Sequence, residues 1–334
     1  MRTLVVSDLH LGSRLRRDVL RHPAALDRLC AELDGVDRLV LLGDTVEMLE
    51  GRPKAALVDA EPVLRALGAA LGKGAEVVLL IGNHDHALVR PWLREQRLKG
   101  RALGLAARVP IRSNPALAAM VGWLKPARVQ VRYPGVWLGD GIWAHHGHYL
   151  DRHLVRQPAV PTSGATPDDY ERALGTSIAA VGAVMAASLP PIIGEPVDRI
   201  AGLIRLAGLA ALPLAASLPG APLLAPLSAG VLGFQFRRVG LPAMAAVTAR
   251  LGVQAEHVLF GHVHRSGPGA DDDRYEWRYN DAQLWNTGCW VYEPVLLAGA
   301  TPPHPYWPGS ALCIEAGEIT ALGLLDDVDP RLMR

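Results

Sequence analysis

The sequence predicts an α/β fold in which short buried strands alternate with helices. Apolar runs rich in leucine and β-branched residues recur along the chain, and stretches that are expected to be helical lie between the first three of these runs. Five of these runs end in a motif of polar residues, and in open α/β sheets ligands bind at the strand ends. Half of the 334 residues are hydrophobic, so the chain can bury a full core and form one large or two smaller domains.

The elements follow from these patterns in chain order. The strands that precede the five motifs are expected at Thr3 to Ser7, Leu39 to Leu42, Val77 to Ile81, Ile142 to Ala144 and Val258 to Phe260. Helices are expected from about Pro23 to Asp34, from about Asp59 to Leu71 and from Pro242 to Leu251. The chain closes with strands expected near Leu284 to Thr287, Ala311 to Glu315 and Ile319 to Leu325.

The five motifs contain the residue types that hold two divalent metal ions. Carboxylate, imidazole and amide ligands without thiolate suit manganese, iron or zinc, and manganese is favoured. Two cations about 3.5–4 Å apart share a carboxylate, activate a water and neutralise charge on a phosphoryl group. Asp44 is the best candidate for that bridge. The motifs are Asp8-Leu9-His10, Gly43-Asp44-Thr45-Val46-Glu47, Gly82-Asn83-His84-Asp85, His146-Gly147-His148 and Gly261-His262-Val263-His264.

This ordered set resembles the calcineurin-like metallophosphoesterase superfamily over residues 1 to 150 and 255 to 325. The resemblance implies a four-layer αββα sandwich in which two mixed sheets face each other and the metal site lies at one edge. It also implies the ligand sets. One ion would be held by Asp8, His10, Asp44 and His264, and the other by Asp44, Asn83, His146 and His262.

The same resemblance implies that His84 is a catalytic residue and not a ligand. In the family, the histidine of this motif protonates the leaving oxygen or stabilises the transition state, assisted by an acidic side chain, and Glu47 matches that position. The chemistry of histidine supports this role, because imidazole titrates near neutrality and a neighbouring carboxylate can tune it. Asn286-Thr287-Gly288-Cys289-Trp290 is similar to a turn that supports the site in relatives, although serine is commoner than cysteine at position 289.

Three further residues are candidate contacts for the substrate. Arg14 and Arg17 follow the first metal motif closely, and arginine suits bidentate contact with phosphate. His148 stands where some relatives carry aspartate, and it could contact substrate or orient a ligand. His145 would point to the opposite side of an extended segment from His146, so we expect a structural role for it.

Positive charge is concentrated in one part of the chain. Between His86 and Arg132, ten lysine or arginine residues accompany a single acid, Glu95, although the formal net charge of the whole chain is +1. We favour a surface for phosphate or anionic headgroups; the alternative is a solvated helix face. Nucleic acid is disfavoured as a partner, because Trp92 and Trp123 are the only aromatic residues of this stretch that could stack on bases.

A second unusual stretch, Leu174 to Phe236, is almost uncharged and is expected to form an apolar, mostly helical insertion or cap. A single membrane span over Leu206 to Gly233 is disfavoured, because four prolines would break the helix. A pair of apolar helices that dips into a leaflet or encloses an acyl chain is favoured. The third interpretation is an ordinary buried cap, or a homodimer interface built from alanine-rich helices.

These patterns divide the chain into a core from 1 to 155, the insertion from 170 to 250, and the rest of the core from 255 to 334. A polar, proline-bearing passage from Gln157 to Asp169 marks the first boundary. Three well-separated cysteines favour a reducing compartment, and a metal motif directly after the first strand leaves no room for a signal peptide. We therefore expect a cytoplasmic protein, with peripheral contact at the inner face of the membrane as an additional expectation.

The substrate is expected to be a phosphate or pyrophosphate ester, hydrolysed by a metal-bridging hydroxide. Ser-Asp-Leu-His-Leu-Gly and Gly-Asp-Thr-Val-Glu resemble UDP-2,3-diacylglucosamine hydrolases more than protein phosphatases, and the apolar insertion fits an acylated molecule. A lipid-linked or amphiphilic substrate such as a UDP-diacylglucosamine-like molecule is therefore favoured. The alternative is a water-soluble nucleotide or cyclic nucleotide, cleaved by a phosphodiesterase or phosphatase whose insertion is only a cap or dimer interface.

Overall fold

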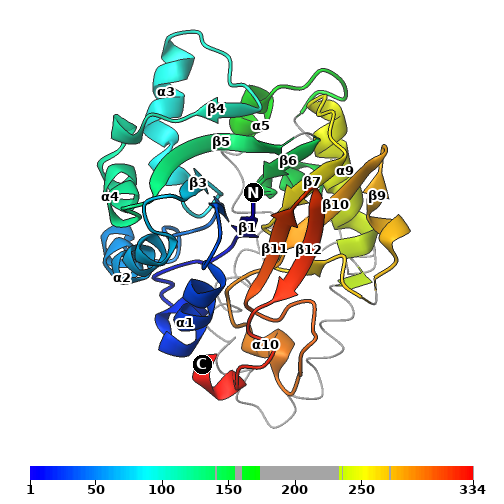
Figure 1. Ribbon diagram of the computed structural model, residues 1–334. Helices are drawn as coiled ribbons and strands as arrows, with labels where there is room; N and C mark the ends of the chain where they lie inside the picture. The colour runs from blue at the N-terminus through cyan, green and yellow to red at the C-terminus, as the bar shows by residue number, and fades with distance from the viewer. Residues whose placement is uncertain (140, 155–159, 174–232, 235, 271, 334) are drawn as a thin grey trace, which may run out of the picture. The chain divides into compact units, whose positions relative to one another are not determined.

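The computed structural model describes residues 1–139, 141–154, 160–173, 233, 234, 236–270 and 272–333 (Figure 1). The chain divides into two compact units. The first contains Met1–His148, Ala255–Tyr292 and Pro302–Arg334, and the second contains Tyr149–Gln254 and Glu293–Thr301. The predicted site residues all belong to the first unit.

Among the described residues, the first unit contains twelve hydrogen-bonded strands. One sheet contains four neighbouring parallel strands: β1 (Thr3–Val6), β2 (Arg38–Leu42), β3 (Glu76–Leu80) and the start of β5 (Arg128–Gly139). Strands β11 (Ser310–Glu315) and β12 (Glu318–Gly323) extend this sheet with antiparallel pairing beside β1. The end of β5 pairs antiparallel with β6 (Ile142–His145), which β7 (His257–Phe260) and β10 (Ala282–Thr287) follow in parallel. The short strands are β4 (Ala106–Arg108), β8 (Ser266–Gly267) and β9 (Arg278–Tyr279).

Strand β5 connects two sheets that pack face to face. Its residues 128–132 pair with β3 and its residues 135–139 pair with β6. A single buried cluster contains side chains from the β1–β2–β3–β11 sheet, such as Val40 and Leu312, together with side chains from the β5–β6–β7–β10 sheet, such as Leu259 and Trp285. The core of this unit therefore lies between the two sheets, and the predicted α/β class, with packed mixed sheets, is confirmed.

In the described part of the first unit, four α-helices connect strands: α1 (Pro23–Glu32), α2 (Pro53–Leu71), α3 (Arg90–Leu98) and α4 (Pro115–Trp123). Helices α1, α2 and α4 lie together beside the β1–β2–β3 sheet (Figure 1). Three of the four begin with proline, whose fixed φ and missing N–H suit the first helical position. Helix α2 begins at Pro53, six residues before the predicted start at Asp59, because this proline occupies the first helical position.

The second unit contains α5 (Pro167–Ala173), a π-helical turn (Phe236–Gly240), α9 (Leu241–Arg250) and the short α10 (Pro294–Leu297). The rings of Tyr149 and Tyr170 stack with centroids 4.6 Å apart, and the Tyr149 hydroxyl donates to Glu171 Oε1 at 2.6 Å. Most of the predicted apolar insertion, residues 174–232, lies outside the described residues. In the part of the chain that the structure describes, no helix is both long and apolar enough to cross a membrane.

Candidate metal centre

Five of the seven residues predicted as metal ligands sit in strained backbone at the ends of their strands. Most residues other than glycine avoid positive φ, and holding one there costs on the order of 1–3 kcal/mol. Such strain persists where the surrounding structure enforces it, and it gathers at functional sites. Five of the nine non-glycine residues with positive φ among those described are predicted ligands: Asp8 (55°), His10 (45°), Asp44 (51°), His262 (72°) and His264 (57°).

Backbone hydrogen bonds hold the first two motifs side by side. The loop after β1 runs along the loop after β2, because the amides of Asp8 and His10 donate to the carbonyls of Gly43 and Asp44 at 3.1 and 2.9 Å. The amide of His262 donates to Asp8 Oδ2 at 2.9 Å and brings the last motif to the first. Residues 254 positions apart in the sequence thus meet at one edge of the two sheets.

Two glycines allow the motifs to approach this closely. A Cβ on Gly82 would lie 2.2 Å from Asp44 Oδ1 and 2.7 Å from Cδ2 of His146. A Cβ on Gly261 would lie 2.5 Å from Asp8 Oδ2. All three distances are far below van der Waals contact, so each glycine is required by its neighbours and not by its own φ.

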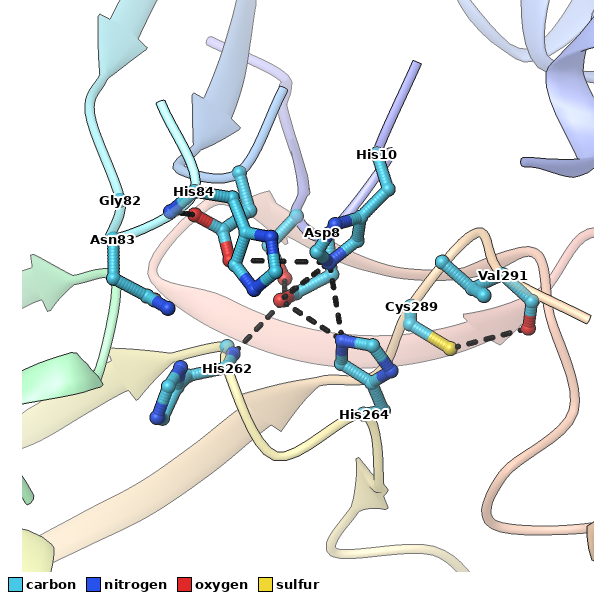
Figure 2. Close-up of polar contacts among 12 residues, drawn as sticks. Asp8, His10, Gly82, Asn83, His84, His262, His264, Cys289 and Val291 are labelled. Atoms are coloured by element: carbon cyan, nitrogen blue, oxygen red, sulfur yellow. Dashed lines mark hydrogen bonds and ion pairs between the residues drawn. The ribbon is translucent and has the colours of Figure 1, made fainter. Parts of the chain in front are cut away.

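Among the described residues, the ligand atoms form three groups, and within each group they lie within 4.8 Å of one another. The first group contains Asp8, His10 and His264, and the second contains Asp44, His146 and His262. The third group, His10, Asp44 and His84, overlaps the other two and also contains the predicted proton donor. Figure 2 shows Asn83 and His84 on one side of Asp8 and His262 and His264 on the other. The Asp8, His10, Asp44 and His146 side chains are buried, whereas those of His84 and His264 are 26% and 25% exposed, so the site is accessible at these two histidines.

The first group brings together atoms that can bind a cation. His10 directs Nδ1 to Glu47 Oε2 at 2.8 Å, so in the neutral ring Nε2 carries the lone pair. That Nε2 lies 3.2 Å from Nε2 of His264 and 3.8 Å from Asp8 Oδ1. Among the described residues, the buried Asp8 Oδ1 accepts no hydrogen bond. In their neutral forms these side chains direct acceptor atoms into one space, and a divalent ion would bind all of those lone pairs together, so these residues fit a metal.

The second group shows the same arrangement. His146 directs Nδ1 to the carbonyl oxygen of Leu42 at 2.9 Å, which leaves Nε2 3.1 Å from Asp44 Oδ2 and 3.1 Å from Asn83 Oδ1. Burial alone lowers the pKa of His146, but the carboxylates of Asp44 and Asp8 offset this and raise the pKa to about 9. A site that attracts a proton this strongly also attracts a metal cation.

His84 and Glu47, which are predicted to act together in proton transfer, lie in hydrogen-bond contact. His84 directs Nδ1 to Glu47 Oε2 at 2.6 Å, and its backbone amide donates to Asp44 Oδ1 at 2.8 Å. Burial favours the protonated form of Glu47, yet the hydrogen bonds from His10 and His84 outweigh burial and lower its pKa well below the usual value. Glu47 is therefore an anion whose Oε2 accepts from the rings of both His10 and His84.

The predicted substrate contacts lie in different environments. Arg14 is exposed, whereas the Arg17 guanidinium pairs with Glu50, whose other oxygen accepts from Ser13 Oγ at 2.7 Å. His148 is fully buried and its ring stacks between those of Tyr133 and His145, with centroids 6.2 and 5.1 Å away. Of the two roles left open for His148, this burial favours orienting the neighbouring His146.

Several supporting residues were not singled out from the sequence. Asp85, the last residue of its motif, is buried and accepts from the amides of Gly82 and Thr45 at 2.7 and 2.8 Å. Burial and the charge of Asp44 raise the Asp85 pKa to about 6. Ser7 contacts Asp8 Oδ2 and Thr287 Oγ1, which are groups that a strand pattern alone cannot bring together.

The turn after β10 and the residue before His146 also support the site. Asn286 Nδ2 donates to the carbonyl of Gly261 at 2.8 Å, and its Oδ1 accepts from the Gly288 amide at 3.0 Å. Cys289 is buried, with Sγ 3.6 Å from the carbonyl oxygen of Val291 (Figure 2). His145 is buried, and its Nδ1 accepts from the Gly147 amide at 2.8 Å, which fixes the turn that carries His146.

Comparison with protein families identifies the family to which this chain belongs. The family model for calcineurin-like phosphoesterases matches residues 1–168, which is half of the chain. This segment contains the motifs of Asp8, Asp44, Asn83 and His146 and the strands that carry them. A comparison with curated proteins gives no match. The chain belongs to the calcineurin-like phosphoesterase family and is a metal-dependent phosphoesterase hydrolase.

Proposed function

We propose that the centre holds two divalent ions that share Asp44 and that it hydrolyses a phosphate or pyrophosphate ester. The observation that carries the proposal is the position of Asp44 Oδ2, which lies 3.1 Å from His146 Nε2 and 3.8 Å from His10 Nε2. One oxygen thus faces both the first and the second group. Asp8, His10 and His264 complete the first ligand set, and Asn83, His146 and His262 complete the second.

When bound, the ions would supply an activated water and neutralise charge on the phosphoryl group. Manganese is the ion we favour, with iron or zinc as alternatives, because the ligands are carboxylate, imidazole and amide. His84 donates a proton to the leaving oxygen from Nε2, since its Nδ1 is committed to Glu47. The partial exposure of His84 lets that oxygen reach the ring.

An amphiphilic, lipid-linked phosphoester is the substrate class we favour. The basic surface, defined by the lysine and arginine residues between His86 and Arg132, supports this choice. Nine of these ten cations are exposed, and among the described residues only Lys99 pairs with a carboxylate, that of Glu95. Leu98, which is 79% exposed on α3, lies among them. Exposed cations around an exposed apolar side chain suit an anionic lipid surface, which also supports peripheral contact with the membrane.

A substrate panel tests the proposal. Protein reconstituted with Mn²⁺ is assayed against 4-nitrophenyl phosphomonoester and phosphodiester, nucleotides, cyclic nucleotides, a UDP-linked diacylated sugar and a phospholipid phosphate. We expect hydrolysis that requires added metal and is fastest on the acylated substrates. Activity on soluble nucleotides alone would contradict the lipid assignment while keeping the metal centre. Absence of metal-dependent hydrolysis on the whole panel would overturn the proposal.

A further inference from the structure

The Glu47 carboxylate contacts more of the site than its role beside His84 requires. Its Oε2 accepts from Nδ1 of His10 at 2.8 Å and from Nδ1 of His84 at 2.6 Å. The two rings meet edge to face with centroids 4.5 Å apart (Figure 2). One oxygen atom therefore fixes the ring of a metal-ligand candidate and the ring of the proton donor.

The second oxygen of Glu47 anchors the carboxylate to the backbone. Its Oε1 accepts from the amides of Leu49 and Glu50 at 2.8 and 3.0 Å, and the Glu47 amide donates to the carbonyl of Leu11 at 3.0 Å. A carboxylate offers about four lone-pair sites, and four donors occupy them here. Glu47 is also 1% exposed. All four lone-pair sites of the carboxylate are thus occupied, and no oxygen is left to bind an ion directly.

The hydrogen bond to Glu47 decides which ring nitrogen of His10 can bind metal. With Nδ1–H donated to Glu47, the lone pair on Nε2 points toward Asp8 and His264. A carboxylate behind a metal-bound imidazole fixes its tautomer and orientation and increases its basicity, and its loss typically weakens metal binding about 10–100-fold. The contact between Glu47 and His84 is not expected to change metal affinity, because His84 is assigned to proton transfer and not to metal binding.

We infer that Glu47 is a positioning residue for the metal ion at Asp8, His10 and His264, in addition to its role beside His84. The inference rests on the proposed two-metal function. It predicts that one carboxylate controls the occupancy of one metal site and the orientation of the acid, and that the site of Asp44, His146 and His262 is independent of Glu47.

The test measures metal binding directly. Metal-free wild type, Glu47→Gln, His84→Ala and Glu50→Gln are titrated with Mn²⁺ by calorimetry, and bound metal is counted by mass spectrometry after desalting. Glu50→Gln is the matched control, since it removes a neighbouring carboxylate that pairs with Ser13 and Arg17. We expect two sites in wild type, His84→Ala and Glu50→Gln. In Glu47→Gln we expect one unchanged site and one weakened about 10–100-fold.

A double variant locates the effect at His10. In a His10→Ala background, the further change Glu47→Gln should leave metal binding unchanged, because the ring that Glu47 orients is gone. Wild-type affinity at both sites of Glu47→Gln, or an equal loss in His84→Ala, would overturn the inference. Circular dichroism checks folding. If Glu47→Gln does not fold, Glu47→Asp, which keeps the charge on a shorter side chain, carries the test with the same expected loss at one site.

The result also separates this inference from the proposed function. Two metal sites in wild type without hydrolysis on the substrate panel would refute the proposed function and leave the role of Glu47 intact. Metal-dependent hydrolysis by wild type, together with normal loading of Glu47→Gln, would refute only the role of Glu47.

Discussion

Oδ1 of Asp44 accepts the backbone amide of His84 at 2.8 Å, and this contact leaves Oδ2 as the oxygen that faces His146 and His10. The two oxygens of one carboxylate therefore have separate tasks. One fixes the loop that carries the proton donor, and the other lies between the first and second groups of ligand candidates. This division makes Asp44 the residue whose charge matters most to the centre.

Asp44→Asn should abolish turnover while the fold is kept. The amide oxygen can still accept from the His84 amide, but the side chain loses the charge that two cations share. We expect hydrolysis to fall by roughly 10²–10³-fold or more, with weaker binding of both ions. Steady-state kinetics and metal counting measure both effects. Full activity in this variant would refute the bridging assignment.

His84→Ala should keep both ions and lose rate. Removing a general acid costs about 10²–10⁴-fold, and the loss depends on how much the leaving group needs a proton. The variant should therefore be impaired more on alkyl phosphoesters than on 4-nitrophenyl esters, whose leaving group departs without help. An equal loss on both substrates would argue against proton donation, and loss of metal would place His84 among the ligands.

Gly82→Ala should disrupt the centre, whereas Gly74→Ala should not. The new methyl group at position 82 would collide with Asp44 and His146, while a Cβ at position 74 meets nothing within 4 Å. We expect Gly82→Ala to lose about 1–3 kcal/mol of unfolding free energy and most of its metal binding. The control should change stability by about 0.5 kcal/mol or less. Urea denaturation and metal counting give the comparison.

Asp18 should make the protein less stable as the pH rises. The side chain is 5% exposed, and burial raises its pKa from 3.8 to about 6. The folded state thus holds the proton more tightly than the unfolded chain. The contribution of Asp18 to the free energy of unfolding is therefore largest below pH 4. It falls as the pH rises to about 6 and beyond, by about 3 kcal/mol in total.

Asp18→Asn removes this titration. Measured against wild type, the variant should become relatively more stable between pH 4 and pH 7, as judged by urea denaturation at several pH values. A difference that stays constant over this range would show that Asp18 titrates with the same pKa in both states.

Reversing charge on α3 should weaken contact with anionic lipid. Arg94 and Arg97 are exposed and have no carboxylate partner among the described residues. Arg94→Glu/Arg97→Glu should reduce binding to vesicles containing phosphatidylserine by about 1 kcal/mol per removed cation or more, and the effect should shrink at high salt. Hydrolysis of 4-nitrophenyl esters should not change. Wild type that does not bind such vesicles would refute the membrane contact.

The sequence allowed most strands to be placed because polar motifs mark where they end. Five predicted strands agree with β1, β2, β3, β6 and β7 to within two residues at each end. Strand β5 was missed because Pro134 and Gly135 interrupt its pattern. They lie where β5 leaves one sheet for the other, and a Cβ at position 135 would lie 2.9 Å from Trp143. The irregularity in the sequence is the point at which the chain joins the two sheets.

Motifs alone indicated which residue types gather, but not which atoms meet. The contact between His10 and Glu47 joins residues 37 positions apart and depends on two neighbouring loops in parallel register. No local pattern encodes it. In the same way, Arg17 was selected for its charge, and its pairing with Glu50 follows from the fold of a loop whose composition is unremarkable.

The passage of β5 between the sheets has a thermodynamic consequence. The first and second groups of ligand candidates take residues from both sheets, with Asp8 and His10 facing His264, and Asp44 facing His146 and His262. An ion bound in either group would cross-link the sheets opposite the covalent link through β5, so neither sheet could separate while metal is bound. The unfolding of this unit should become more cooperative with metal, since both sheets must open in a single step.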